Sequence, residues 1–291
     1  MIERAAQFDR VAARSDAARF AAAYDPIGIL PPDQYLALVL QATTGCSFNT
    51  CTFCDLYHQP FRVKTLDEFR RHIREVRDYL GDSLLLRQRS IFLGAANALA
   101  VPMPRLLPLF EIMQEAFAPS PENRGGAGAG VGAFLDAFTG TRKSAEDYRA
   151  LAERGLRRVY IGLESGHDPL LEFVRKPGHA QDAIDTVQAI KAAGVNIGVI
   201  VLIGLGGERF AAGHIADTIS VLNRMQLGSG DFLYFSNLVE EPDTPYPILA
   251  AQQGIRALTA IERAAQRDAI RAGLPASGVK SSHYDVREFV Y

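Results

Sequence analysis

Short apolar runs alternate with longer amphipathic stretches along most of the chain. Six runs are predominantly apolar instead of alternating with polar residues, as strands are when both faces of their sheet are covered. These runs occupy 35–41, 90–94, 131–138, 158–162, 196–203 and 231–238. Segments with apolar residues at helical spacing follow them, at 65–80, 104–117, 144–154, 180–193, 211–223 and 249–272. This alternation predicts a parallel sheet whose strands are joined by right-handed helical crossovers.

Six strand–helix units suit an open, curved barrel better than a closed barrel of eight. We therefore expect an α/β fold, a partial (β/α)6 TIM-like barrel over 35–247. An Ala-rich helical extension is expected over 1–34, and a C-terminal helix and tail packed on the barrel over 248–291. In barrels of parallel strands the functional site lies at the carboxyl ends of the strands.

Composition narrows the class of protein. Of the 291 residues 48% are apolar, which is ample for a large core, and the net charge is −2. A charge so near zero gives no indication of a nucleic-acid or anionic membrane partner. No run approaches the roughly 20 apolar residues of a membrane span, and the first residues lack the apolar segment of a signal peptide. With its thiols few and clustered, the protein is expected in the reducing cytoplasm.

The three cysteines of the chain lie within nine consecutive positions, at Cys46, Cys51 and Cys54. Their spacing is C-x4-C-x2-C, in a loop that follows the first predicted strand. The loop is rich in Thr, Ser and Asn, which is a poor environment for buried, inert thiols. Closely spaced thiolates on such a loop indicate a metal ion or an iron–sulfur cluster.

Three kinds of site could use these thiolates. A structural zinc ion needs a fourth ligand, which His58 could supply. A plant-type [2Fe–2S] cluster begins with the same spacing but needs a distant fourth cysteine, which the chain lacks. A [4Fe–4S] cluster held by three thiolates would leave one iron open to a substrate or cofactor. The loop alone does not separate zinc from this cluster.

Further motifs at strand ends give the cysteine loop a context. Gly94-Ala95-Ala96-Asn97 follows the second run, Gly162-Leu163-Glu164-Ser165-Gly166 the fourth and Ile203-Gly204-Leu205-Gly206-Gly207 the fifth. Together with the cysteine loop they resemble the radical S-adenosylmethionine (SAM) superfamily over roughly residues 31–245. The superfamily's commonest spacing is C-x3-C-x2-C. The longer C-x4-C-x2-C spacing of this chain resembles that of a bacterial subgroup of the superfamily, some members of which are labelled coproporphyrinogen-oxidase-like.

The resemblance implies a set of cofactor ligands. The three cysteines would bind a [4Fe–4S] cluster. SAM would be contacted by Phe53, Gly94, Asn97, Glu164, Ser165, Ile203, Gly204 and Leu238. Ala95 and Ala96 stand where the family has an acidic residue for the methionine amino group. Asn97 or backbone carbonyls would therefore have to bind that group.

The resemblance also implies an activity. The reduced cluster would cleave SAM to a 5′-deoxyadenosyl radical, which abstracts hydrogen from an unidentified small or medium-sized substrate. Asp136 and Tyr234 are the catalytic candidates on the substrate side, and a flavodoxin- or ferredoxin-type protein would supply the electron. The reaction could belong to an oxidoreductase, a lyase or an isomerase.

Two alternatives compete with this hypothesis. One is a non-catalytic binding protein stabilised by zinc on Cys46, Cys51, Cys54 and His58. The other is a radical SAM barrel with weak SAM turnover, because the acidic residue near Asn97 is missing.

Overall fold

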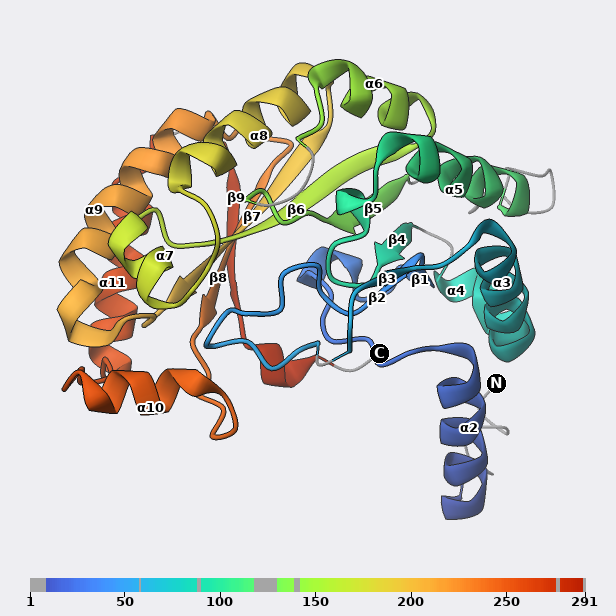
Figure 1. Cartoon of the computed structure of the whole chain (residues 1–291), viewed down its shortest axis with the longest axis horizontal. Coiled ribbons are helices and arrows are strands. Elements are labelled where there is room, and N and C mark those ends of the chain that lie inside the picture. The colour runs from blue at the N-terminus through green and yellow to red at the C-terminus, as the bar shows by residue number, and fades with distance from the viewer. Residues whose placement is uncertain are drawn as a thin grey trace.

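A computed structural model describes residues 9–57, 59–87, 90–117, 130–138, 142–275 and 278–289. Within them, one curved sheet contains seven parallel strands, which follow the order of the chain. The strands are β1 (Leu38–Gln41), β4 (Ile91–Gly94), β5 (Val131–Phe134), β6 (Leu156–Glu164), β7 (Asn196–Ile203), β8 (Phe232–Asn237) and β9 (Lys280–Tyr284). Figure 1 shows the sheet curving inside an arc of helices. The prediction of a parallel α/β fold is confirmed.

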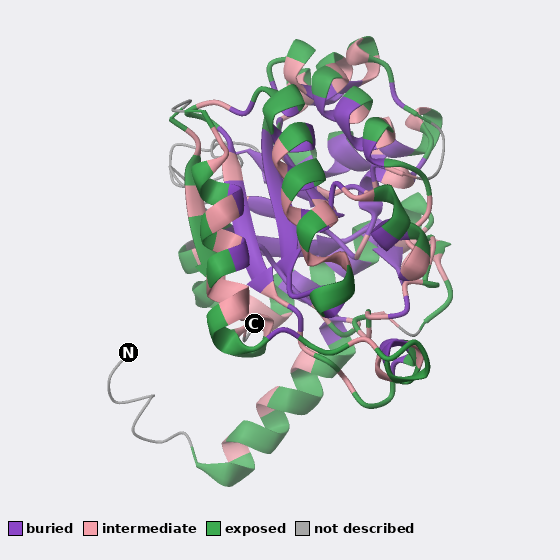
Figure 2. Cartoon of the chain, turned by 90° about the vertical axis from the view of Figure 1, so that its left-hand side faces the viewer, coloured by how far each residue is buried: buried purple, intermediate pink, exposed green. Residues whose placement is uncertain are grey.

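The outer layer covers the convex side of this sheet. It contains α3 (Leu66–Leu80), α5 (Met103–Ala116), α6 (Ala145–Glu153), α8 (Ala180–Ala192) and α9 (Gly207–Met225). Capping boxes begin α3 at Thr65 and α6 at Ser144, where hydroxyl and carboxylate side chains satisfy backbone N–H groups. In Figure 2 the strands are buried behind the helices, whose outward faces are exposed. The main core therefore lies between the sheet and this layer.

Smaller elements surround the first strand. The helix α2 (Arg10–Ala23) projects from the body and contacts α3, where the Tyr79 hydroxyl donates to Asp16 at 3.2 Å (Figures 1 and 2). The short strands β2 (Thr43–Thr44) and β3 (Arg62–Val63) pair with each other, and α4 (Leu84–Arg87) precedes β4. In the part of the chain that the structure describes, we found no helix with the length and hydropathy of a membrane span.

The C-terminal region differs from its prediction. The expected single helix over 249–272 is two helices, α10 (Pro245–Gln252) and α11 (Ala260–Ala272). Gly254 has a φ of 63° and follows the end of α10, and Thr259 begins α11 with a new capping box. The expected tail supplies a seventh strand, β9, which extends the sheet beyond β8. Its sequence Lys-Ser-Ser-His-Tyr is largely polar, so the apolar pattern gives no signal for it.

A polar cluster occupies the N-terminal ends of the strands. Asp33, in a short 3-10 segment before β1, accepts hydrogen bonds from the hydroxyls of Tyr160 (2.6 Å) and Tyr234 (2.7 Å). Arg158, near the start of β6, donates to the same carboxylate at 2.8 Å. The Tyr160 ring lies against Gly198, where an added Cβ would overlap it. These side chains fill the interior at the N-terminal ends of the strands. The open space inside the curved sheet therefore lies at the carboxyl ends.

Candidate functional site

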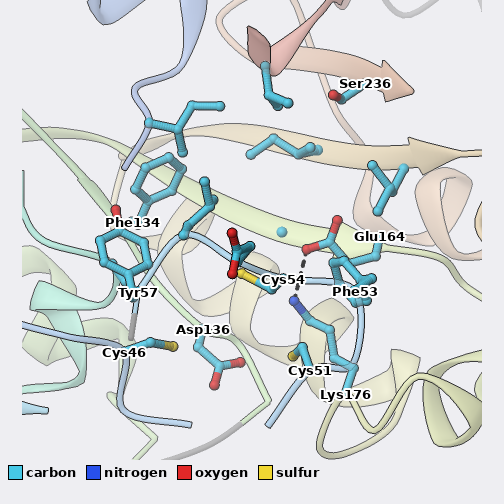
Figure 3. Close-up of a pocket in the computed structure, with 18 of the residues that line it drawn as sticks. Cys46, Cys51, Phe53, Cys54, Tyr57, Phe134, Asp136, Glu164, Lys176 and Ser236 are labelled. Atoms are coloured by element: carbon cyan, nitrogen blue, oxygen red, sulfur yellow. Dashed lines mark hydrogen bonds and ion pairs between the residues drawn. The ribbon is translucent and has the colours of Figure 1, made fainter. Parts of the chain in front are cut away.

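A cavity of about 350 Å³ lies at the carboxyl ends of the strands. Its walls come from the cysteine loop and from residues at the ends of β4 to β9 (Figure 3). The predicted site residues that line it are Cys46, Cys51, Phe53, Cys54, Asn97, Asp136, Glu164 and Leu238. The fold thus brings all three thiols into one cavity with residues at or just after the ends of four strands, β4, β5, β6 and β8.

The cysteine loop leaves and rejoins the body through the β2–β3 pair. Thr44 pairs with Arg62 across this neck, and Gly45 follows with a φ of 66°. An added Cβ at Gly45 would overlap the backbone oxygen of Gln59, at the far end of the loop. Only glycine suits both the left-handed conformation and this close approach. Cys46 therefore follows directly after the point where the two ends of the loop are packed against each other.

The middle of the loop is held by backbone hydrogen bonds. Thr52, which is 1% exposed, donates its N–H to the Val174 carbonyl at 3.0 Å. The Thr52 carbonyl accepts from the Tyr246 N–H at 2.9 Å, and the Tyr246 hydroxyl accepts from the Gly206 N–H at 2.9 Å. Tyr246 on α10 thus links the segment between Cys51 and Cys54 to the loop after β7.

A second small apolar core supports these hydrogen bonds. It contains Leu170, Val174, Leu202, Leu205, Leu238, Tyr246 and Ala250, with Phe53 packed against it. Leu170 belongs to α7 (Asp168–Phe173), and Val174 follows that helix. Phe53 and Leu238, both predicted SAM contacts, therefore share one apolar wall.

Glu164 and Lys176 form an ion pair on the cavity wall. Their charged atoms are 3.0 Å apart, and the side chains are only 14% and 11% exposed (Figure 3). Burial disfavours the charge of Lys176, but nearby acidic groups, Glu164 foremost and Asp136 among them, more than offset this effect and raise the pKa of Lys176. Glu164 has a φ of 58°, a strained conformation that non-glycine residues keep mainly at functional sites. The Glu164 carboxylate is therefore held at a fixed position.

Lys176 is a site residue that the sequence analysis missed. It lies 12 positions after Glu164, beyond α7, and no motif marks it. The cue available in the sequence was the positive charge shortly after a strand end that carries a carboxylate. That cue is weak, because exposed lysines are common in such loops.

Asn97 joins the cysteine loop to the end of β5. Its side-chain N–H donates to the Ser47 hydroxyl at 2.6 Å, and its carbonyl accepts from the Asp136 N–H at 2.9 Å. Asn97 is 1% exposed. Both ends of its amide therefore bind protein groups, so the observed role is to connect two walls of the cavity.

Several predicted site residues do not line the cavity. They are Gly94, Ser165, Ile203, Gly204 and Tyr234. The Ser165 hydroxyl lies 2.6 Å from Nδ1 of the buried His214, and the Gly204 N–H donates to Gln266 on α11 at 2.8 Å. The Tyr234 hydroxyl binds Asp33 at the opposite end of the strands. The structure therefore places Ser165 and Gly204 behind the cavity wall and Tyr234 beneath it.

The donor set of the cavity fits an iron–sulfur cluster chemically. Burial raises the pKa of the Cys51 thiol to about 12, so cluster binding would have to displace its proton. No three Cys, His, Asp or Glu side chains among the described residues converge closely enough for one metal ion. Three thiolates that each bind a different iron need no such convergence. His58, the fourth ligand of the zinc hypothesis, lies outside the described residues.

Comparison of the sequence with protein families identifies the chain's relatives. The model of the radical SAM superfamily matches residues 40–219, more than half of the chain. The chain therefore belongs to the radical SAM superfamily. Membership implies a [4Fe–4S] cluster and SAM as cofactors. No curated protein sequence matches significantly.

Solved structures of radical SAM enzymes share the fold. Coproporphyrinogen III oxidase (HemN) from Escherichia coli has a TM-score of 0.59 and 15% identity, covering 91% of this chain and 56% of that one. The methyltransferase TsrM from Kitasatospora setae has a TM-score of 0.54 and 18% identity, covering 75% and 37%. SuiB from Streptococcus suis has a TM-score of 0.54 and 12% identity, covering 94% and 54%. The chain thus spans only part of each enzyme, and such low identities carry the fold alone.

Proposed function

We propose that this chain is a radical SAM enzyme whose cavity binds a [4Fe–4S] cluster and SAM side by side. The observation that carries the proposal is the position of Cys46, Cys51 and Cys54 around one cavity with Glu164 and Lys176. When bound and reduced, these cofactors supply a 5′-deoxyadenosyl radical that abstracts hydrogen from the substrate.

Different residues of the cavity bind different parts of the two cofactors. The three cysteines bind the cluster. The ammonium group of Lys176 attracts the SAM carboxylate, and Glu164 accepts hydrogen bonds from the SAM ribose or methionine groups. Phe53 and Leu238 provide an apolar wall for adenine. Excluding water from this wall strengthens every charge interaction in the cavity.

The predicted residues behind the wall act through their neighbours. Ser165 fixes the turn after Glu164 by accepting from the His167 N–H at 3.0 Å. Ile203 accepts from the Leu238 N–H at 2.8 Å, and Gly204 binds Gln266. We assign Ser165, Ile203 and Gly204 a positioning role.

The substrate side of the proposal rests on Asp136. It lines the cavity just after β5, and its carboxylate accepts from the Phe138 N–H at 3.0 Å. Tyr234 has no such support, because its hydroxyl is bound to Asp33. An external flavodoxin- or ferredoxin-type protein would supply the electron. The cytoplasm is the compartment we propose, since the three thiols must remain reduced.

Weak SAM turnover is a second candidate function. Asn97 uses both ends of its amide within the protein. Ala95 and Ala96 add no carboxylate for the SAM amino group. SAM binding without formation of 5′-deoxyadenosine would favour this alternative.

Anaerobic reconstitution tests the proposal. We expect a brown protein with about four irons per chain, as a [4Fe–4S] cluster requires. A colourless protein with one zinc ion would contradict it. Replacement of His58 with Ala separates the two sites, because a cluster held by three cysteines keeps its iron and a Cys3His zinc site loses its metal.

A further inference from the structure

We propose that the wall of the cavity built from β7, β8 and β9 is the substrate subsite. It takes a largely apolar molecule, neutral or positively charged, whose hydrogen-bonding group reaches the Ser236 hydroxyl. The inference rests on the proposed function, because the cysteine loop and the apolar wall of Phe53 and Leu238 are assigned to the cluster and SAM. It adds the chemical class of the substrate.

Ser236 on β8 is the polar group that points to a ligand. The side chain is 1% exposed and lines the cavity. Its Oγ makes no hydrogen bond of good geometry among the described residues, and the one polar contact that it makes there is a weak one with the Tyr284 side chain. Figure 3 shows it on the side of the cavity away from Cys46. A poorly paired buried hydroxyl costs free energy, so a ligand that pairs with it gains affinity.

The strands beside Ser236 make its surroundings apolar. Leu202 on β7 and Tyr284 on β9 are in register with Ser236, and all three line the cavity. Ile200 on β7 and Phe134 on β5 extend this surface. Tyr284 packs edge-on against Tyr234 at a centroid distance of 5.9 Å. A largely apolar compartment whose hydroxyl groups are those of Ser236 and Tyr284 fits an apolar substrate that carries one hydrogen-bonding group.

The charged side chains that line the cavity determine which sign of charge a ligand can carry. Among the described lining residues the acidic side chains are Asp55, Asp136, Glu164 and Glu241, and the only basic one is Lys176. Lys176 is paired with Glu164 at 3.0 Å. Arg287 is near Glu241 but is itself held by Asp285.

An anionic substrate would therefore meet more carboxylates than cations. An anion buried without a cation beside it binds poorly, and like charges across a binding surface are repelled. A neutral group or a cation meets no such penalty.

Three probes with one apolar body test the inference. They are 4-phenylbutanol, 4-phenylbutylamine and 4-phenylbutyrate, titrated by calorimetry into the reconstituted enzyme saturated with SAM and without reductant. We expect the alcohol and the amine to bind, and the carboxylate to bind at least roughly tenfold more weakly. Glu241→Gln is expected to reduce the difference in affinity between the alcohol and the carboxylate, because it removes one negative charge from the cavity.

Ser236→Ala tests the hydroxyl. It is expected to weaken binding of the alcohol about fivefold, which corresponds to the loss of one neutral hydrogen bond. It should lower the unfolding midpoint little, because the contact that Oγ loses among the described residues is a weak one with the Tyr284 side chain. Ser90→Ala is the matched control. The Ser90 hydroxyl donates to Gln34 at 3.1 Å, before the start of β4, so this variant should bind the probes normally.

Three results would overturn the inference. They are binding of the carboxylate as tight as that of the alcohol, unchanged binding of the alcohol by Ser236→Ala, and binding of neither the alcohol nor the amine. Iron content and 5′-deoxyadenosine formation are measured on the same preparation. Normal values for both, together with any of these results, reject the substrate inference and leave the proposed function intact.

Discussion

The Glu164–Lys176 pair gives the sharpest test of how the cavity is built. We expect Lys176→Met to lower the free energy of unfolding by about 3 kcal/mol, because it leaves Glu164 charged and buried without its partner. The methionine side chain keeps most of the volume of lysine. Packing is therefore disturbed little, and the electrostatic effect dominates.

The magnitude follows from the geometry. At the observed separation of 3.0 Å, two unit charges attract by about 5.5 kcal/mol at an effective dielectric constant of about 20. Desolvation of both groups offsets part of this attraction. Removing one partner of a buried pair typically costs about 3–5 kcal/mol, and the 11% exposure of Lys176 favours the lower end. The double variant Lys176→Met/Glu164→Gln should recover at least half of the loss.

Equilibrium urea unfolding of the iron-free chain under reducing conditions measures these differences. Arg70→Met is the control, because its pair with Asp67 at 3.7 Å is exposed and should contribute less than about 1 kcal/mol. The pair does not organise the cavity if Lys176→Met lowers the free energy of unfolding by less than about 1 kcal/mol, as the control does. The same conclusion follows if the double variant recovers none of the loss. SAM affinity of the reconstituted variant should fall about tenfold if the ammonium group binds the SAM carboxylate.

The remaining predictions concern the supports of the site. Gly45→Ala should prevent cluster assembly, measured as iron per chain, while Gly81→Ala keeps its iron, because both have positive φ but only Gly45 is closely approached by backbone. Tyr246→Phe should cost about 1–3 kcal/mol in urea unfolding and weaken SAM binding, since it leaves a buried N–H of the loop after β7 without its acceptor. Burial lowers the pKa of both His72 and His214 to about 4, below the usual 6.5. Because the unfolded chain then binds more protons, their contribution to stability is complete above about pH 6.5 and falls toward pH 4, by up to about 1.4 kcal/mol per pH unit for each histidine. His214→Gln should reduce this slope in urea unfolding at several pH values, and an unchanged slope would contradict the assignment.

Local signals in the sequence predicted much of the fold. The apolar runs located β1 and β4 to β8, and the apolar residues at helical spacing over 65–80 located α3. These signals work because the burial of a strand or of one helix face shows in nearby residues. β9 was missed because a polar edge strand carries no apolar pattern. The break between α10 and α11 was missed although Gly254 marked it.

The candidate site was predictable only in part. Residues next to a strand end, such as Glu164 and Asp136, could be located from the strand alone. Lys176 and Tyr246 could not, because their partners are 12 and 40 positions away in the chain. The role of Asn97 was equally hidden, since Ser47 and Asp136 reach it only in the folded chain.

Formation of 5′-deoxyadenosine tests the central claim most directly. The reconstituted protein is incubated with SAM and dithionite, and the product is quantified by chromatography. We predict that the wild-type chain forms 5′-deoxyadenosine and that Cys51→Ala, which removes one cluster ligand, forms none. Absence of product from a wild-type chain that carries zinc instead of iron would contradict the assignment.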